Sequence, residues 1–362
     1  MRALRIYAGP AARQHIESNG LRPADIGAVP AAAGGPKGLI LGPLDRFLFG
    51  EWLPQTSHTI HLVGASIGAW RMATACLREP VQAFERLERD YVSQVHELPP
   101  GRKTPGAAQL SRRFAQDLQS FYGGRVREML EHPRFRLHVV TARGRHLLGR
   151  EHRIATPVGY LGAFLSNVVH RKAMGAWLER VVFSAPESGS PCPLPFDTAD
   201  FPTRQVPLTE ENFHPALQAS CAIPFMLQAV HDIPGAPRGA YWDGGITDYH
   251  LHLKYACGPG RGLVLYPHFQ KAVVPGWLDK GLPWRHRATP FLDRMIVLAP
   301  DPEWVRKLPN GKLPDRTDFM RYATDLPGRI AAWGTAASAS RQLADEFAEW
   351  LRRPDARCVE LL

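Results

Sequence analysis

Two short apolar segments near the N-terminus each run into a glycine-rich turn and are followed by a helical pattern. The first is DIGAVPAAA at residues 25–33, and the second is TIHLV at residues 59–63. Short apolar runs that end at turn residues predict buried strands. Apolar side chains then recur at helical spacing from Gly38 onward and again from Ile67 onward. Strand, tight turn and helix, repeated in this way, predict an α/β sheet with ligand chemistry at the ends of its strands.

Further segments extend this pattern along the chain. Helical spacing predicts three more helices, which carry Phe84, Leu87, Tyr91 and Val95; Leu110, Phe114, Leu118 and Phe121; and Leu343, Phe347, Trp350 and Leu351. Apolar runs predict strands at residues 135–141, 181–184, 262–266 and 295–299. No internal repeat, low-complexity tract or clear linker interrupts the chain. We therefore expect residues 1–362 to form one domain.

Composition and charge narrow the function classes. The chain has 362 residues, of which 44% are hydrophobic and 22% charged, as is typical of a globular protein. Its net charge of +10 favours anionic partners such as a membrane surface, nucleic acid or acidic metabolites. The basic residues are scattered, and no zinc-finger or RNP-type motif occurs. We therefore expect no nucleic-acid partner.

The cysteines and the apolar segments bear on localisation. Five cysteines are widely spaced without a CxxC pair, which argues against a disulfide framework or a structural zinc site and suits a reducing compartment. No stretch has the pattern of a signal peptide or is long and uncharged enough to span a bilayer. We expect a cytoplasmic protein, with peripheral contact at the inner membrane face as an option.

Residues 64–68 read Gly-Ala-Ser-Ile-Gly, directly after one predicted strand and before its helix. The order G-x-S-x-G in this context is typical of a nucleophile elbow. Its glycines allow close approach of strand and helix and hold the serine in a strained backbone conformation. Ser66 would then be presented at a helix N-terminus, where developing negative charge is favoured.

A second glycine turn, AGGPKG at residues 33–38, lies one strand–helix unit upstream. Such a turn can point successive backbone N–H groups at an oxyanion. A plain helix-entry turn explains the same residues equally well. A nucleotide-phosphate loop fits poorly, because neither the G-x-x-x-x-G-K-S/T order nor the G-x-G-x-x-G spacing is met.

Two kinds of side chain are candidates for the base that activates Ser66. Four histidines follow it in the chain, as an α/β-hydrolase triad would require: His250, His252, His268 and His286. None lies in a motif, and the H-x-H pair lacks a third partner that would indicate a metal, so we expect structural or surface roles for all four. The other candidate is Asp243 in the sequence YWDGG, where a simple turn is the alternative interpretation.

The block Ser-Cys-Ala-Ile-Pro at residues 220–224 precedes Asp243, and with it the chain resembles the patatin-like phospholipases. That family carries a glycine-rich oxyanion loop of the form G-G-G-x-K/R-G, a G-x-S-x-G elbow, an S-x-A-x-P-like block and an Asp-Gly-Gly or Asp-Gly-Ala motif. All four occur here in that order, within residues 33–248. The loop departs from the pattern in having Ala33 for the first glycine and Ala32 where an acidic residue is often found.

The resemblance implies a fold and a set of roles. The fold is a three-layer α/β/α sandwich with a central mixed or mainly parallel sheet. The dyad contains no histidine: Ser66 is the nucleophile and Asp243 takes its proton. Gly34 and Gly35 supply the oxyanion N–H groups, Lys37 fixes the loop, and no metal or other cofactor is expected. Residues after about 255 match no motif, and we expect them to supply lid and specificity elements and the C-terminal helix.

The implied activity is hydrolysis of lipid carboxylic esters, of the phospholipase A or lysophospholipase type, through an acyl-Ser66 intermediate. A small-ester carboxylesterase or an acyltransferase on the same dyad is the alternative enzyme, and a lipid-binding pseudoenzyme is the non-catalytic alternative. The chemistry is coherent, because a carboxylate is a weak base in water and partial burial in a lipid-facing pocket raises its pKa.

Two stretches have the composition of lipid-contacting surfaces. Residues 158–178 form either an interfacial helix or lid or, as such stripes more often do, part of the core. Their marked side chains are Leu161, Phe164, Leu165, Val168 and Trp177, flanked by Arg171 and Lys172. The second stretch is a loop that we expect to pack on the surface, with membrane contact as the alternative; it carries Trp277, Leu278, Trp284, Arg285 and Arg287.

Overall fold

Buried apolar strands from all parts of the chain join in one mixed sheet. The computed structural model describes residues 2–94, 106–187, 189–258 and 262–362. The strands are β1 (Leu4–Ala8), β2 (Ile26–Ala31), β3 (Ile60–Ala65), β4 (Phe135–Gly144), β5 (Leu178–Ser184), β8 (Thr203–Pro207), β9 (Val230–His231), β10 (Ala240–Asp243), β11 (Leu263–Pro267), β12 (Met295–Pro300) and β13 (Val359–Leu361). Their order is β13-β1-β12-β11-β2-β3-β4-β10-β9, and β5 and β8 continue the sheet from β4. A separate hairpin consists of β6 (Pro186–Glu187) and β7 (Ser190–Pro191).

The centre of the sheet is parallel, and its strands are buried on both faces. The pairs from β12 through β11, β2 and β3 to β4 are all parallel. Every position of β2 is buried, and so is every position of β3 except the half-buried His61. Strands buried on both faces require helices on both sides of the sheet.

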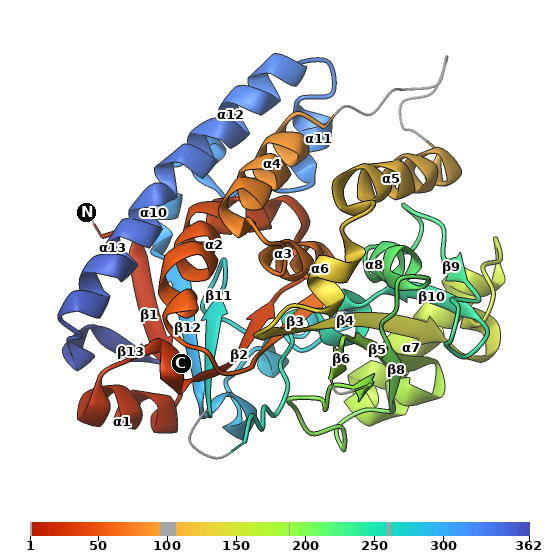
Figure 1. Ribbon diagram of the computed structural model, residues 1–362. Helices are drawn as coiled ribbons and strands as arrows, with labels where there is room; N and C mark the ends of the chain where they lie inside the picture. The colour runs from red at the N-terminus through yellow and green to blue at the C-terminus, as the bar shows by residue number, and fades with distance from the viewer. Residues whose placement is uncertain (1, 95–105, 188, 259–261) are drawn as a thin grey trace.

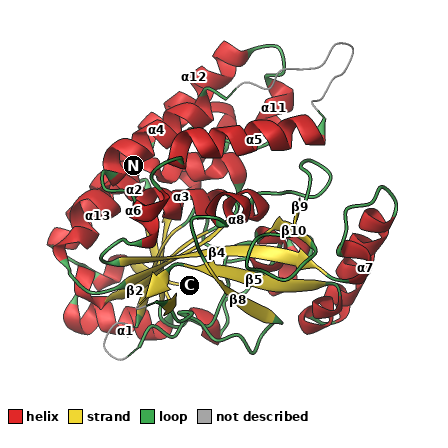
Figure 2. Cartoon of the chain, turned by 45° about the vertical axis from the view of Figure 1, so that its right-hand side comes forward, coloured by secondary structure: helices red, strands yellow, loops and turns green. Residues whose placement is uncertain are grey.

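Helices cover both faces, so the fold is the expected three-layer α/β/α sandwich (Figure 1). The helices are α1 (Pro10–Asn19), α2 (Gly42–Phe47), α3 (Ile67–Ala75), α4 (Pro80–Val92), α5 (Ala107–Tyr122), α6 (Val126–Leu130), α7 (Ala155–Val169), α8 (Phe213–Ser220), α9 (Gly245–Asp248), α10 (Pro302–Val305), α11 (Thr317–Arg321), α12 (Leu326–Ala339) and α13 (Arg341–Arg352). Figure 2 shows α2, α3, α4, α5 and α12 on one side of the sheet and α1 on the other. No described helix is both long and apolar enough to cross a bilayer.

Strand β10 lies between two helices from opposite layers. Its Tyr241 belongs to the large core cluster that includes Phe213 and Leu217 of α8. The next residue, Trp242, belongs to a smaller cluster with Tyr160 and Ala163 of α7. Because successive side chains of a strand point to opposite faces, α7 and α8 clamp β10 from both sides.

The predicted elements are confirmed, except that one helical segment is irregular. The six predicted strands correspond to β2, β3, β4, β5, β11 and β12, and the predicted helices to α3, α4, α5 and α13, with Val95 lying outside the described residues. The helical segment after Gly38 is irregular, with 3₁₀ geometry over Gly35–Leu41, then α2, then a π turn over Leu48–Trp52. The elements that were not predicted are strands β1, β6, β7, β8, β9, β10 and β13 and helices α1, α6, α8, α9, α10, α11 and α12.

The last third of the chain contributes more than lid elements and a terminal helix. Strands β11 and β12 lie inside the sheet, between β1 and β2. Strand β13 pairs with β1 in parallel, so that strands from the two ends of the chain are neighbours. Loops from this third also reach the cavity described below.

Candidate active site

Two strands that meet end to end along β4 create the site. Strand β3 pairs with β4 up to Ala65 opposite Val140, and β10 pairs with β4 up to Asp243 opposite Thr141. Val140 and Thr141 are consecutive, so β3 and β10 share one edge of β4 and end at the same point. Ser66 follows β3 directly, and it is thereby brought against Asp243 although 177 residues separate them.

The elbow at residues 64–68 has the strained geometry that its sequence predicts. Ser66 has a φ of 56° and a ψ of −130°, a backbone conformation that residues other than glycine rarely adopt. A Cβ atom on Gly64 would lie 2.5 Å from Cα of Ala69, and one on Gly68 would lie 1.9 Å from the carbonyl oxygen of Ala31. Both contacts are with backbone, so only glycine fits at either position.

The small-residue block at 220–224 holds the elbow and the DGG turn together. The backbone N–H of Ser66 donates to Oγ of Ser220 at 2.9 Å, and that hydroxyl donates to the carbonyl oxygen of Val140 at 2.7 Å. The N–H of Gly244 in turn donates to the carbonyl oxygen of Ser220, and that of Asp243 to the carbonyl oxygen of Ala222. Ser220 therefore links all three segments, a role that its motif alone did not reveal.

Ser66 and Asp243 form a direct hydrogen bond. Oγ of Ser66 donates to Oδ2 of Asp243 at 2.7 Å, and the N–H of Gly245 donates to Oδ1 at 2.7 Å. Both residues are buried. One carboxylate oxygen is thus held by the backbone while the other faces the serine hydroxyl, which is the orientation that a general base requires.

Burial raises the pKa of Asp243 to about 6, although the hydrogen bond from Ser66, the charge of Arg316 and the N–H of Gly245 each lower it. A carboxylate with this pKa is ionised at neutral pH and is a better base than one in water.

Cys221 lies nearby, and burial together with the charge of Asp243 raises the pKa of its thiol well above the usual value. This thiol stays protonated, so it does not compete with Ser66 as a nucleophile.

The glycine turn at residues 33–38 faces the same point. It begins a helical segment at Gly35, and the first N–H groups of a helix have no partner within it. Gly34 must lack a side chain because a Cβ would lie 2.6 Å from the Phe269 ring, and Gly35 has a φ of 57°. A Cβ on Gly245 would lie 2.6 Å from Cβ of Ala33, so the alanine at the first loop position is accommodated by the second glycine of the DGG turn.

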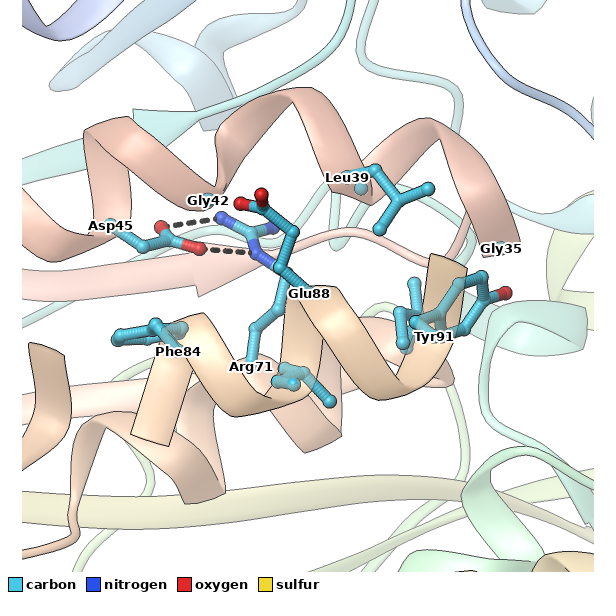
Figure 3. Close-up of a pocket in the computed structure, with 11 residues that line it drawn as sticks. Gly35, Leu39, Gly42, Asp45, Arg71, Phe84, Glu88 and Tyr91 are labelled. Carbon is cyan, nitrogen blue, oxygen red and sulfur yellow. Dashed lines mark hydrogen bonds and ion pairs between the residues drawn. The ribbon is translucent and has the colours of Figure 1, made fainter. Parts of the chain in front are cut away.

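A buried ion pair joins α2, which follows the glycine loop, to α3, which follows the elbow (Figure 3). Arg71 of α3 donates to both carboxylate oxygens of Asp45 of α2, at 2.7 and 2.8 Å. The hollow around this pair is lined by both helical segments and α4, and it includes Gly35 and Ile67, next to the candidate site. Bidentate pairing of this kind fixes geometry as well as energy.

An open cavity of about 770 Å³ contains the dyad. Its wall is formed by Ala33, Gly34, Lys37, Ser66, Ile223, Pro224, Asp243, Gly245, Ile246, Tyr249, Trp277, Lys280, Asp315, Arg316 and Thr317. Among the described residues, the three cations of this wall form no ion pair, whereas the carboxylate of Asp315 pairs with Lys312 at 2.7 Å. No motif marks Lys280 or Arg316, and the sequence offered no signal for either.

The cations of the cavity lie close to one another. Nζ of Lys37 lies 5.2 Å from the centroid of the Phe269 ring, and Nζ of Lys280 lies 4.8 Å from that of Tyr249. Burial lowers the pKa of Lys280, and the charges of Lys37 and Arg316 lower it further. Lys37, which was expected to fix the loop, lies in the wall of the cavity with its ammonium over the Phe269 ring.

The histidines take the structural roles expected of them. His250 bonds to the backbone at Ala272, and His252 bonds to Thr289 at 2.9 Å. His268 bonds to the carbonyl oxygen of Gln270, and His286 bonds to that of Asp279. In the part of the chain that the structure describes, no histidine hydrogen-bonds to the dyad.

Helix α7 exposes the apolar stripe for which core packing was the favoured interpretation. Leu161 is 58% exposed, and Leu165, Val158 and Ile154 are exposed on the same face. The buried residues of the helix are the small or polar Thr156, Gly159, Ala163 and Asn167 and the aromatic Tyr160. Core packing is therefore wrong for this face. Phe164 and Trp177 are half-buried.

The loop at residues 277–287 has side chains that pack into the structure and others that are exposed. Arg285 is committed to structure, through an ion pair with Asp279 at 2.9 Å and a hydrogen bond to Asn167 of α7. Arg171 pairs with the same Asp279 at 3.1 Å, so it is not free to face solvent. Trp284 and Arg287 are exposed, and Arg285 between them donates to the carbonyl oxygen of Val168 at the C-terminal end of α7.

Comparison with protein-family models, with curated proteins and with solved structures found no match to this chain. The likeness to patatin-like phospholipases therefore depends on the four motifs and on the geometry that brings them together.

We predict that Gly68→Ala destabilises the fold by about 2 kcal/mol or more, because the added methyl group would overlap a backbone carbonyl that cannot turn aside. Thermal or denaturant unfolding measures this. Gly334→Ala on α12, where a Cβ meets nothing within 4 Å, is the matched control and is expected to be neutral or stabilising. Equal effects of the two substitutions would contradict the close approach of strand and helix.

The reactivity of Ser66 is predicted to depend on the charge of Asp243. Because the folded-state pKa of this carboxyl is about 6, it becomes protonated below that pH and no longer accepts the serine proton. The rate of Ser66 labelling by a fluorophosphonate is therefore expected to be constant near pH 8 and to fall about tenfold per pH unit below pH 6. Labelling that does not change between pH 5 and pH 8 would rule out Asp243 as the base.

Proposed function

We propose that the protein is a lipid acyl hydrolase that cleaves carboxylic esters through an acyl-Ser66 intermediate. The observation that carries the proposal is the 2.7 Å hydrogen bond from a strained elbow serine to a buried aspartate inside an open cavity. In such a pair the carboxylate accepts the proton that the serine must lose to act as a nucleophile. No metal or other cofactor is needed for this chemistry.

The proposed reaction has two steps. Oγ of Ser66 attacks the acyl carbon while its proton passes to Oδ2 of Asp243, and N–H groups of the loop at 33–38 stabilise the oxyanion. Collapse of the tetrahedral intermediate breaks the ester C–O bond, and Asp243 returns the proton to the leaving alcohol. Water then gives a proton to Asp243 and attacks the acyl-enzyme, which releases the acid and restores the Ser66 hydroxyl.

Hydrolysis of a short-chain and a long-chain p-nitrophenyl ester and of a phospholipid tests the function. We expect Ser66→Ala to abolish turnover and Asp243→Asn to lower kcat about 10²- to 10⁴-fold, the usual effect of losing a general base. His252→Gln, which removes one histidine alternative, is the control and should keep the wild-type rate. Full activity of the Asp243 variant, or a wild type inactive on all three esters, would overturn the proposal.

Two alternative functions of the same residues predict different experimental results. An acyltransferase would form the same acyl-enzyme and pass the acyl group to an added alcohol faster than to water. A non-catalytic lipid-binding protein would leave Ser66 unlabelled by a fluorophosphonate at pH 8. The intact dyad supports the hydrolase over the latter.

The cations of the cavity favour a substrate with an anionic headgroup, so we propose a phospholipid or lysophospholipid rather than a neutral ester. Lys37, Lys280 and Arg316 form no ion pair among the described residues and surround the same space as the dyad. A phosphate held there would offset their charges and keep the adjoining acyl ester beside Ser66.

Lys280→Gln is predicted to lower kcat/KM for a phospholipid by about tenfold or more, the loss expected for one hydrogen bond to a charged group of about 1.5–3 kcal/mol. The rate on a neutral p-nitrophenyl ester should change less than about twofold. Lys307→Gln, at an exposed position outside the cavity, is the control. A parallel loss on both substrates would show that Lys280 does not recognise the headgroup.

The exposed face of α7 supports peripheral contact with a membrane from the cytoplasmic side. The apolar stripe continues toward the cavity through Phe225, which is 59% exposed, contacts Tyr160 of α7 and follows the cavity residue Pro224. The exposed cations of residues 145–172 are Arg150, Arg153 and Lys172, and the one exposed acidic residue is Glu151. Apolar side chains bordered by cations suit the surface of an anionic bilayer.

Leu161→Gln with Leu165→Gln is predicted to weaken binding to phosphatidylglycerol-containing vesicles by about tenfold or more, since each buried leucine contributes about 1.5–3 kcal/mol. Hydrolysis of the short soluble ester should not change. Leu361→Gln, at an exposed residue of the edge strand β13, is the control. Unchanged vesicle binding, or a dimer that the double variant disrupts, would show that another surface covers this face.

A further inference from the structure

Two histidines and a cysteine that the dyad does not use converge on one point. Nδ1 of His61 lies 3.0 Å from Nε2 of His138, and Sγ of Cys192 lies 3.8 Å from the same Nδ1. All three atoms lie within 4.8 Å of one another. His138 and Cys192 are fully buried, and His61 is half-buried.

Three separate segments bring these side chains together. His61 lies on β3 and His138 on β4. His138 stands opposite Val63, and Val63 shares a face with His61 because alternate residues of a strand point the same way. Both rings therefore project from the same face of the sheet. Cys192 follows the hairpin β6–β7, and its N–H donates to the carbonyl oxygen of Ala185. His61 stands four positions before Ala65, roughly 13 Å along the strand at about 3.3 Å per residue, so this cluster is separate from Ser66.

The donor set has the chemistry of a zinc site. Imidazole nitrogen and thiolate sulfur are the ligands that zinc prefers, at about 2.0–2.3 Å. Atoms 3.0 and 3.8 Å apart are both within reach of a single ion at those bond lengths. Oε2 of Glu187 lies 3.5 Å from Sγ of Cys192 but outside this group of three, so it would have to move toward the ion to complete the tetrahedron.

The surroundings orient the donors. Nδ1 of His138 lies 2.9 Å from Oγ of Ser184, and Nε2 of Gln205 donates to the same hydroxyl at 2.9 Å. When Nδ1 of His138 donates to Ser184, its Nε2 carries the lone pair that faces the cluster. A ligand histidine whose second nitrogen is held by a hydrogen bond is the usual arrangement in metal sites.

We propose that His61, His138 and Cys192 bind one zinc ion. The ion would link the hairpin β6–β7 to β3 and β4, and so stabilise the strand that leads to the elbow. Binding releases the thiol proton to solvent and forms a Zn–S bond, with no redox step. The proposal is independent of the hydrolase function, because none of these residues contacts the dyad or lines its cavity.

The test uses metal-free full-length protein titrated with zinc against a chromogenic chelator. The wild type is expected to take up one equivalent, and its thermal midpoint to rise by roughly 3 °C at a hundredfold excess over Kd. Cys192→Ser should weaken binding more than about a hundredfold, since loss of an outer partner alone costs about 10- to 100-fold. Cys358→Ser, at a half-buried cysteine of the C-terminal segment, is the control and should bind as the wild type does.

Cobalt substitution gives a readout that does not depend on the folding of a variant. Cobalt bound at this site should show a thiolate-to-metal charge-transfer band in the wild type, and the same band in Ser66→Ala. Its absence from the wild type, or equal zinc uptake by the Cys192 and Cys358 variants, would overturn the proposal and leave the cluster as an internal hydrogen-bond network. Loss of esterase activity in Ser66→Ala with zinc binding intact would separate this claim from the hydrolase.

Discussion

The end-to-end meeting of β3 and β10 along β4 is the constraint on which the candidate site depends. Pairing of Ala65 with Val140 and of Asp243 with Thr141 leaves the following Ser66 no position other than beside the carboxylate. Ser220 bonds to the Ser66 backbone and to Val140, so the same hydroxyl group holds both ends in register. The hydrogen bond of the dyad is thus a consequence of sheet pairing rather than of local sequence.

This arrangement has an energetic cost that the surrounding structure offsets. Ser66 adopts a positive φ, and Asp243 is buried where its charge is disfavoured. The backbone N–H of Gly245, the Ser66 hydroxyl and the charge of Arg316 all act to keep the carboxylate ionised. The buried Asp45–Arg71 pair holds the two helices behind the elbow and the loop. The strain therefore lies where reactivity is needed, and rigid helices and strands surround it.

Local patterns in the sequence predicted the parts whose cause is local. Short apolar runs between turn residues predicted the central strands, and the glycines at 64 and 68 predicted the elbow because only glycine fits there. Asp243 was predicted from its neighbourhood of motifs. Lys280 and Arg316 were not, since they reach the cavity from loops whose path depends on the whole fold.

Other features could not be predicted for the same reason. Periodicity identified the apolar stripe of α7 but not the face that it presents, which depends on whether Tyr160 or Leu161 packs on Trp242. The wide spacing of cysteines argued against zinc, yet pairing of β3 with β4 brings His61 and His138 together with Cys192. Ligands drawn from three segments leave no spacing motif.

The most direct test of the central claim is the position of the acyl group during turnover of a p-nitrophenyl ester. The reaction is quenched in acid within the first turnover, and the digested protein is examined by mass spectrometry. The account predicts an acyl adduct on the peptide that contains Ser66, absent from Ser66→Ala and reduced in Asp243→Asn. An adduct on Cys221 or on a histidine, or turnover without any adduct, would contradict it.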